Sequence, residues 1–318
     1  MRTRRGASMW DQDTFVSAVG DAVRAPSIHN SQPWRFRRTE GGIEVRVDPA
    51  RALPATDPDG RAARVSCGAA AANLALSLAV AEAPADVATH AGAVHLTPAV
   101  PRPPTPLERR LHWQIWRRHT NRSPFADTAV AAGVTTQLVR QVESDGGWLD
   151  LVEDGPDLHA LAALTHEADT ELRADPRYLA ELRAWSTGAD QDVEGVGPRA
   201  AGATPHPGEL MTRRDFGGPG HEGTRDPGRG PVVAVFGVHG DRPADELRAG
   251  IVLQRLLLLA ADLGLAAALF SQPIEVPAVR EQVRLALHRS HDPQLVLRFG
   301  YAPSTCFTNR RPPSDVIG

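Results

Sequence analysis

The chain has 318 residues, of which 42% are hydrophobic and 23% charged, enough apolar sequence for one large domain or two closely packed ones. Its formal net charge is -3, so no basic field attracts nucleic acid or an anionic membrane, and we expect neither as a partner. All 35 basic residues are arginines. Any anion that binds must therefore be held by a local cluster of arginines.

The cysteines and the apolar stretches favour a cytoplasmic protein. Cys67 and Cys306 lie far apart without a CxxC motif, so we expect structural thiols in a reducing compartment. The basic first residues are followed by Trp10 and two aspartates rather than an apolar run, which does not match a signal peptide. The apolar stretch 251–269 is interrupted by charged and polar residues, so it predicts buried structure rather than a membrane span.

The first part of the chain predicts a helix, a hairpin and a second helix. Apolar residues at helical spacing favour a helix over residues 11–25, which Pro26 ends because proline lacks an amide hydrogen. Alternating segments at 34–38 and 43–47, joined by a turn with two glycines, predict a β-hairpin. The alanine- and leucine-rich segment 62–83 predicts a core helix.

Prolines cluster between residues 97 and 106, which favours an extended connector and supplies the best domain boundary. We therefore expect a first domain over residues 1–105 and a second over 106–318. The second domain predicts helices at 107–119, 135–143, 158–183, 247–263 and 276–288, and strands at 148–152, 231–238, 266–270 and 295–299. The expected fold class is α+β, with helices packed on a mixed sheet.

Residues 187–230 are rich in glycine and proline and have few apolar anchors. A segment of this length without secondary structure is usually either a lid over a site or a disordered insert, and composition alone leaves both open. Because it lies between two predicted core elements, we expect it to act as a lid.

Two segments carry residue types suited to binding a ligand. Residues 25–34, A-P-S-I-H-N-S-Q-P-W, form a loop that can hold a planar heterocycle, although Ser27 and Asn30 could instead bond to the local backbone. Residues 117–125, R-R-H-T-N-R-S-P-F, follow a predicted helix. Their arginines could bind phosphate or could simply complement the helix dipole in solvent.

The first of these segments resembles a motif of the FMN-dependent nitroreductase family. Residues 25–36 are similar to the family's P-S-S-x-N-x-Q-P-W-x-F segment, which belongs to one subunit and touches the flavin held by the other. The resemblance implies that Pro26, Ser27 and Asn30 approach FMN. It implies no particular role for His29.

The second segment resembles the family's R-x-S-x-R-x-F opening, in which the first arginine and the hydroxyl meet the FMN phosphate. The resemblance gives that role to Arg118 and Thr120 and places Arg122 near the ribityl or pyrimidine side. The family often has lysine at the last position, so the planar guanidinium of Arg122 is a departure. Two or three guanidinium groups around a phosphate would contribute roughly 1.5 to 3 kcal/mol each.

Two further segments complete the resemblance. Residues 263–273 are similar in outline to the family's G-L-x-x-x-P-x-E-G region, which gives backbone contacts to the flavin N5 and O4 edge to Ser271 and Gln272, although Ser-Gln replaces Glu-Gly. Residues 308–312 resemble the basic tail that returns to the phosphate. This implies roles for Arg310 and Arg311 and leaves open which of them reaches it.

The order of the motifs differs from that of a single nitroreductase subunit, because the P-S-x-x-N loop comes before the phosphate motif and each occurs once. The resemblance therefore implies the Acg-type branch of the family, a nitroreductase-like fold in which two halves of one chain mimic the family homodimer and build one FMN site. A monomer would suffice for a complete site, and a homodimer stays possible.

The resemblance implies an oxidoreductase in which NAD(P)H reduces FMN and a small acceptor, such as a nitroaromatic, a quinone or an endogenous metabolite, reoxidises it. The flavin N5 carries the chemistry, so no catalytic side chain is expected. Two alternatives stay open: an FMN-sequestering or storage protein with a closed lid, and a flavin dehydrogenase for one metabolite. No metal site is expected, since the paired histidines stand seven residues apart on predicted helices.

Overall fold

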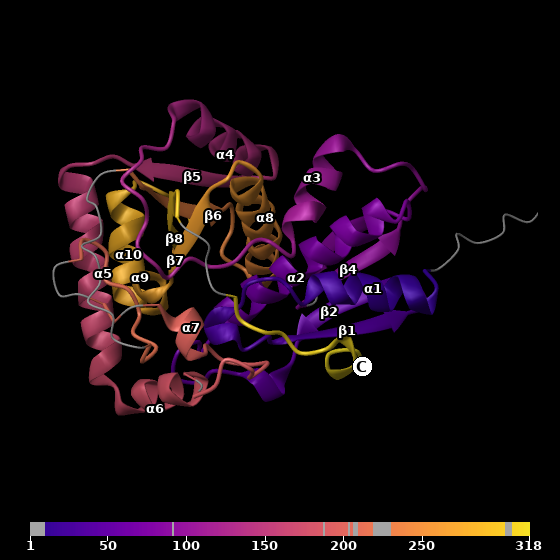
Figure 1. Cartoon of the computed structure of the whole chain (residues 1–318), viewed down its shortest axis with the longest axis horizontal. Coiled ribbons are helices and arrows are strands. Elements are labelled where there is room, and N and C mark those ends of the chain that lie inside the picture. The colour runs from indigo at the N-terminus through magenta and orange to yellow at the C-terminus, as the bar shows by residue number, and fades with distance from the viewer. Residues whose placement is uncertain are drawn as a thin grey trace, which may run out of the picture.

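The computed structural model describes residues 10–90, 92–186, 188–202, 204–205, 209–218, 230–302 and 307–318. Cys306 and part of the expected lid lie outside these ranges. The described chain forms two halves, each with a four-stranded sheet and a long helix, and the two long helices α2 and α8 pack together at the centre (Figure 1). The α+β class is confirmed.

The first half contains α1 (Gln12–Ala22), β1 (Trp34–Thr39), β2 (Gly42–Val47), α2 (Arg61–Val80), β3 (Ala85–His90) and β4 (Ala93–Pro98). The predicted hairpin and both predicted helices are confirmed. Asp11 caps α1 by accepting a hydrogen bond from the Thr14 amide. The strands β3 and β4 were not predicted, and β4 takes up the first residues of the expected connector.

The second half contains α3 (Pro106–Gln114), α4 (Ala132–Ser144), β5 (Gly147–Val152), α5 (Pro156–Ala174), α6 (Pro176–Trp185), α7 (Pro198–Ala201), β6 (Val232–Val238), α8 (Pro243–Asp262), β7 (Ala266–Phe270), α9 (Gln272–Glu275), α10 (Pro277–Ala286) and β8 (Pro293–Gly300). The single helix expected over 158–183 is wrong. It is divided into α5 and α6, because Pro176 lacks the amide hydrogen a continuous helix would use, while Asp175 caps the new start.

The two halves repeat one topology. The sheet orders are β1-β2-β4-β3 and β5-β6-β8-β7, and in each half the long helix connects the second and third strands. Neighbouring strands in both sheets are antiparallel throughout, so the prediction of a mixed sheet is wrong. Parallel pairs occur in the described chain as isolated bridges.

The contact between α2 and α8 is reciprocal. A Cβ at Gly68 of α2 would lie 1.9 Å from the Leu247 carbonyl oxygen of α8, and a Cβ at Gly250 of α8 would lie 1.9 Å from the Val65 carbonyl oxygen of α2. Each glycine thus meets the carbonyl three residues before the other glycine. This is the contact pattern of a two-fold axis.

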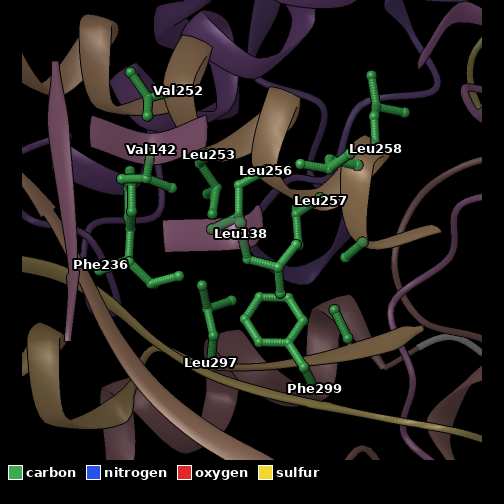
Figure 2. Packing of buried hydrophobic residues seen from close by; sticks show 14 of the residues in the cluster. Leu138, Val142, Phe236, Val252, Leu253, Leu256, Leu257, Leu258, Leu297 and Phe299 are labelled. Atoms are coloured by element: carbon green, nitrogen blue, oxygen red, sulfur yellow. The ribbon is translucent and has the colours of Figure 1, made fainter. Parts of the chain in front are cut away.

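Apolar side chains fill the space between the long helices and the sheets. In the second half, residues of α4, β6, α8 and β8 meet in one cluster, including Leu138, Phe236, Leu256 and Phe299 (Figure 2). The cluster also takes in Leu76 of α2, so the cores of the halves are continuous. By length and composition α2 could span a membrane, but most of it is buried inside the protein.

The C-terminal residues return to the first half, where they run along β1 (Figure 1). The Phe36 amide donates to the Val316 carbonyl at 2.9 Å, and the Gly318 amide donates to the Phe36 carbonyl at 3.0 Å. Val316 is fully buried in the first half's core. These hydrogen bonds hold residues 307–318 against the first half, beside the loop that follows α1.

Candidate binding site between the halves

A cavity of about 220 Å³ lies where the two halves and the expected lid meet. Its wall is formed by the loop after α1, the first turns of α2, the residues after α3, and the strand β7 with α9. The lid segment contributes Ala201, Arg213, Arg214 and Phe216. A smaller polar cavity adjoins it, lined by Pro26, Ser27, Asn30, His119, Thr120, Arg122, Thr308 and Arg310. Three segments that are distant in sequence thus line the polar cavity.

The loop after α1 is strained. His29, Asn30 and Gln32 have φ values of 50°, 55° and 52°, in the left-handed region that non-glycine residues rarely adopt. The Gln32 amide donates to the Ser27 hydroxyl at 3.0 Å, which closes the loop. Strain of this kind is concentrated at sites that need a fixed shape.

Asn30 and Gln32 connect this loop to the tail and the lid. The Asn30 Nδ2 donates to the carbonyls of Gly195 at 2.9 Å and Asn309 at 3.1 Å. The Gln32 Nε2 donates to the Val193 carbonyl at 2.6 Å. The buried Oδ1 of Asn30 has no partner among the described residues, and Asn30 lines the polar cavity.

The guanidinium groups of Arg122 and Arg310 line the polar cavity, and that of Arg118 is buried close to both, without a compensating carboxylate among the described residues. Burial lowers the pKa of Arg118 to about 10 and of Arg310 to about 9, and neighbouring arginines add to both shifts. Burial and then Arg214 lower the pKa of Arg122 to about 10. None of the three forms a salt bridge with a carboxylate in the described part of the chain. Uncompensated buried charge of this kind is costly, so the cluster is suited to an anion.

Backbone carbonyls at the end of α1 hold two of these side chains. An Nη2 of Arg118 donates to the Arg24 carbonyl at 3.2 Å, and an Nη2 of Arg310 donates to the Ala25 carbonyl at 3.2 Å. The Nε atoms of both guanidiniums are buried and have no partner among the described residues. These two buried donors are therefore unsatisfied within the described part of the chain.

His119 and Thr120 complete the polar cavity. The Thr120 backbone forms a parallel bridge to Ala267, which fixes the segment against β7. Burial, and then Arg118, Arg310 and Arg24, lower the pKa of His119 to about 4. His119 is therefore neutral near pH 7. Sequence reasoning did not single it out, because one histidine between arginines carries no distinctive pattern.

Ser271 and Gln272 follow β7 and line the main cavity. The Gln272 Nε2 donates to the Thr212 carbonyl of the lid segment at 3.2 Å. The structure thus brings together nine of the ten residues singled out in the sequence. Eight of them line the two adjoining cavities: Pro26, Ser27, Asn30, Thr120, Arg122, Ser271, Gln272 and Arg310. Arg118 lines neither cavity but lies close to Arg122 and Arg310.

Arg311 is the exception. Its guanidinium pairs with Glu194 at 3.3 Å, and its backbone amide donates to the Gln32 Oε1 at 2.8 Å. It lines neither cavity. Of the two tail arginines, Arg310 is the one beside Arg118, and Arg311 instead fastens the loop and the lid segment.

The described lid residues reach into the main cavity. The Nη2 of Arg214 donates to both carboxylate oxygens of Glu275 on α9, at 2.8 and 2.7 Å, with both side chains buried. Its Nη1 contacts the Nε2 of His29. Phe216 meets the His29 ring edge-on, 5.7 Å between centroids. Sequence reasoning missed Arg214 and Glu275, because an arginine in a glycine-rich insert gives no indication of its distant partner.

Two mycobacterial proteins are similar to the chain over nearly its whole length. "Putative NAD(P)H nitroreductase acg" of Mycobacterium tuberculosis strain H37Rv is 32% identical over 329 residues, covering 98% of this chain and 97% of its own. "Putative NAD(P)H nitroreductase Rv3131" of the same strain is 31% identical over 309 residues, covering 92% of this chain and 86% of its own. No family model matches the chain.

Among solved structures, the FMN and NADPH-dependent nitroreductase NfnB from sphigopyxis sp. strain HMH aligns with 65% of this chain and 97% of its own, at 16% identity and a TM-score of 0.41. An identity and a TM-score this low do not assign the chain to a family. The relationship therefore depends on the mycobacterial relatives.

Proposed function

Because the chain belongs to the nitroreductase family and is an oxidoreductase of that family, we propose that it binds one FMN between its two halves and passes electrons from NAD(P)H to a small acceptor. A nitroaromatic, a quinone or an endogenous metabolite fits the acceptor role. The names of the two mycobacterial relatives, both NAD(P)H nitroreductases, support the nicotinamide donor. The proposed location is the cytoplasm.

The observation that carries the proposal is the cluster of Arg118, Arg122 and Arg310. Their charges are uncompensated in the described chain, and two of them keep an unpartnered Nε. A dianionic phosphate ester would supply the missing charge and acceptors at roughly 1.5 to 3 kcal/mol for each charge-assisted hydrogen bond. The phosphate of FMN fits this cluster.

The larger cavity fits the rest of the cofactor. Its wall combines Ala268, Leu269 and Phe270 of β7 with the polar loop after α1. The unpartnered Oδ1 of Asn30 suits a ribityl hydroxyl, and backbone amides at Ser271 and Gln272 suit a ring edge that accepts hydrogen bonds. When bound, FMN would supply two-electron redox chemistry. The chain's own residues would orient it and exclude water.

We also propose that the two halves take the places of the two subunits of the family homodimer. The repeated sheet order and the reciprocal contacts of Gly68 and Gly250 support this. So does the division of labour at the site, where Pro26, Ser27 and Asn30 come from the first half and the arginines from the second. A monomer would then hold one complete site, and residues 1–105 and 106–318 would be its halves.

The direct test is to titrate the purified, flavin-free protein with FMN and then to mix the loaded protein anaerobically with NADPH or NADH. We expect one FMN per chain and bleaching of the flavin absorbance by at least one nicotinamide. A protein that does not bind FMN would contradict the proposed function. Binding without reduction by either nicotinamide would favour the storage role instead.

The contacts of the lid segment bear on that storage alternative. Arg214 with Glu275, Asn30 with Gly195 and Gln32 with Val193 all hold the described lid residues against the site. A buried ion pair is costly to break, since removing one partner typically costs 3 to 5 kcal/mol. We therefore expect access to the flavin to limit turnover, and nitroreductase activity to be weak.

A further inference from the structure

His29 is buried in the wall of the main cavity with only 3% of its surface exposed. Its Nε2 contacts an Nη1 of Arg214. A guanidinium nitrogen can only donate a hydrogen bond, so the Nε2 of His29 must accept. The proton of the neutral ring therefore resides on Nδ1.

The His29 ring is kept neutral by its surroundings. Burial lowers its pKa well below 6.5, and the charges of Arg214 and Arg122 lower it further. Phe216 packs edge-on against the ring from the lid side. Two carboxylates act on Arg214: Glu275, which pairs with it, and Asp169. Protonation of Nε2 would place a second donor against the Arg214 guanidinium.

The Nδ1 donor has no partner among the described residues, although it is closed off from water. An unpaired buried donor costs roughly 1 to 3 kcal/mol, so a ligand in the cavity that His29 lines would be stabilised by accepting this bond. Glu275 holds Arg214 in place, and Arg214 in turn orients the His29 ring through its contact with Nε2. The donor is thus fixed in one tautomer and one direction.

The position of His29 favours the second substrate over the cofactor as the acceptor of this bond. Pro26, Ser27 and Asn30 line the polar cavity that suits the phosphate, whereas His29 lines only the main cavity, where it contacts two residues of the lid segment. A substrate entering beneath the lid would meet His29. Arg122 adds positive potential nearby, which suits an oxygen that gains negative charge.

We propose that His29 binds a carbonyl or nitro oxygen of the electron acceptor through its Nδ1–H, in the tautomer fixed by Arg214. This inference rests on the proposed function and names the acceptor class as a quinone or nitro compound. His29 orients the acceptor and keeps its own proton. Arg214 is a positioning residue, because it acts only through the imidazole.

Two variants of His29 test whether the hydrogen-bond donor must stand at the Nδ1 position, since both keep a side-chain donor. In His29→Asn the side-chain amide lies where Nδ1 was, and in His29→Gln it lies where Nε2 was. Both fit the backbone, since asparagine favours the left-handed region and Gln32 already adopts it in the same loop. His159→Asn, which changes an exposed histidine on α5, is the control.

The experiment titrates 1,4-naphthoquinone into the oxidised, FMN-loaded protein and measures its dissociation constant. We expect His29→Asn and the control to match the wild type, and His29→Gln to bind roughly three- to tenfold more weakly, the loss of one hydrogen bond. In ¹⁵N-labelled protein, the quinone should shift the His29 Nδ1–H resonance, with Nε2 unprotonated at pH 6.5 and above.

Equal quinone affinities in all variants would overturn the inference, as would a resonance that FMN alone shifts and the quinone does not. Protonation of Nε2 in the free protein would overturn the fixed tautomer. Failure of the proposed function is seen separately, as a chain that retains no FMN or a bound FMN that no nicotinamide reduces.

Discussion

At the scale of single residues, Arg118 creates a conflict between folding and binding. Its guanidinium is buried beside like charges, which destabilises the flavin-free fold, and it supplies donors that a phosphate would use. Arg118→Met keeps much of the side-chain volume and removes the charge. We expect the melting temperature of the flavin-free protein to rise by roughly 2–4 °C and FMN affinity to fall at least tenfold.

Differential scanning fluorimetry and flavin fluorescence measure the two effects. Arg311→Ala is the control, because Arg311 is a buried tail arginine whose charge is paired with Glu194, whereas Arg118 has no carboxylate partner among the described residues. It should lower stability and leave FMN affinity within about threefold. The arginine cluster would not be the phosphate site if Arg118→Met changed stability and FMN affinity only as much as Arg311→Ala does.

His119 predicts how stability depends on pH. Its folded-state pKa of about 4 is below the ordinary value of 6.5, so between these values the unfolded chain binds a proton that the folded chain does not. The stabilising contribution is fully present above pH 6.5 and is lost as the pH falls toward 4. Urea unfolding of the flavin-free protein at several pH values should show this loss, and His119→Asn should reduce it. An unchanged slope in the variant would contradict the assignment.

The site residues show what the sequence could and could not predict. Pro26, Asn30, Arg118 and Thr120 could be proposed from the sequence because they belong to short motifs with fixed spacing. Arg214 and Glu275 were missed because their contact joins positions 61 residues apart. The choice between Arg310 and Arg311 needed the structure, since adjacent residues of an extended tail point in different directions.

At the scale of elements, the crossing of α2 and α8 requires glycine at two positions. A methyl group at Gly68 or Gly250 would meet a carbonyl oxygen at 1.9 Å, so the helices would have to move apart. We expect Gly68→Ala or Gly250→Ala to lower the free energy of unfolding by about 1–3 kcal/mol or more and to weaken FMN binding, because the site spans both halves.

Gly133→Ala is the control for these substitutions, since Gly133 lies in α4 with open space around its Cα and alanine favours a helix. Denaturant unfolding should show Gly133→Ala unchanged or more stable by up to about 1 kcal/mol. Gly68→Ala behaving like this control would show that the helices do not cross this closely.

The lid segment supplies the second prediction at this scale. Replacing residues 188–230 by a short glycine-serine linker removes the contacts of Arg214, Gly195 and Val193 with the site. We expect faster reduction of bound FMN by NAD(P)H or dithionite in stopped-flow measurements, with an unchanged circular dichroism spectrum apart from α7. An unchanged rate would mean that the segment does not limit access.

The secondary structure followed from the sequence wherever a pattern was strong. The hairpin of β1 and β2 alternates clearly, and β7 matches its predicted bounds. The strands β3 and β4 were missed, because β3 is mostly exposed and lacks a core-facing run, and β4 merges into prolines. The order of the strands within each sheet depends on long-range pairing, which local patterns do not contain.

At the scale of the whole molecule, one chain provides two halves related by a pseudo-two-fold contact and, in the described residues, cavities built from both halves. The C-terminal tail strengthens the arrangement, since Arg310 reaches the site and Val316 is buried in the first half. The complete site should therefore need no second chain.

The most direct test of this account is the FMN content of the monomer, measured by sedimentation velocity with simultaneous detection of flavin and protein absorbance over a dilution series. We expect one FMN per chain in the monomer at every dilution at which the concentration stays above the dissociation constant of FMN. Two FMN per chain, or flavin that is lost when a dimer dissociates to monomers, would contradict it.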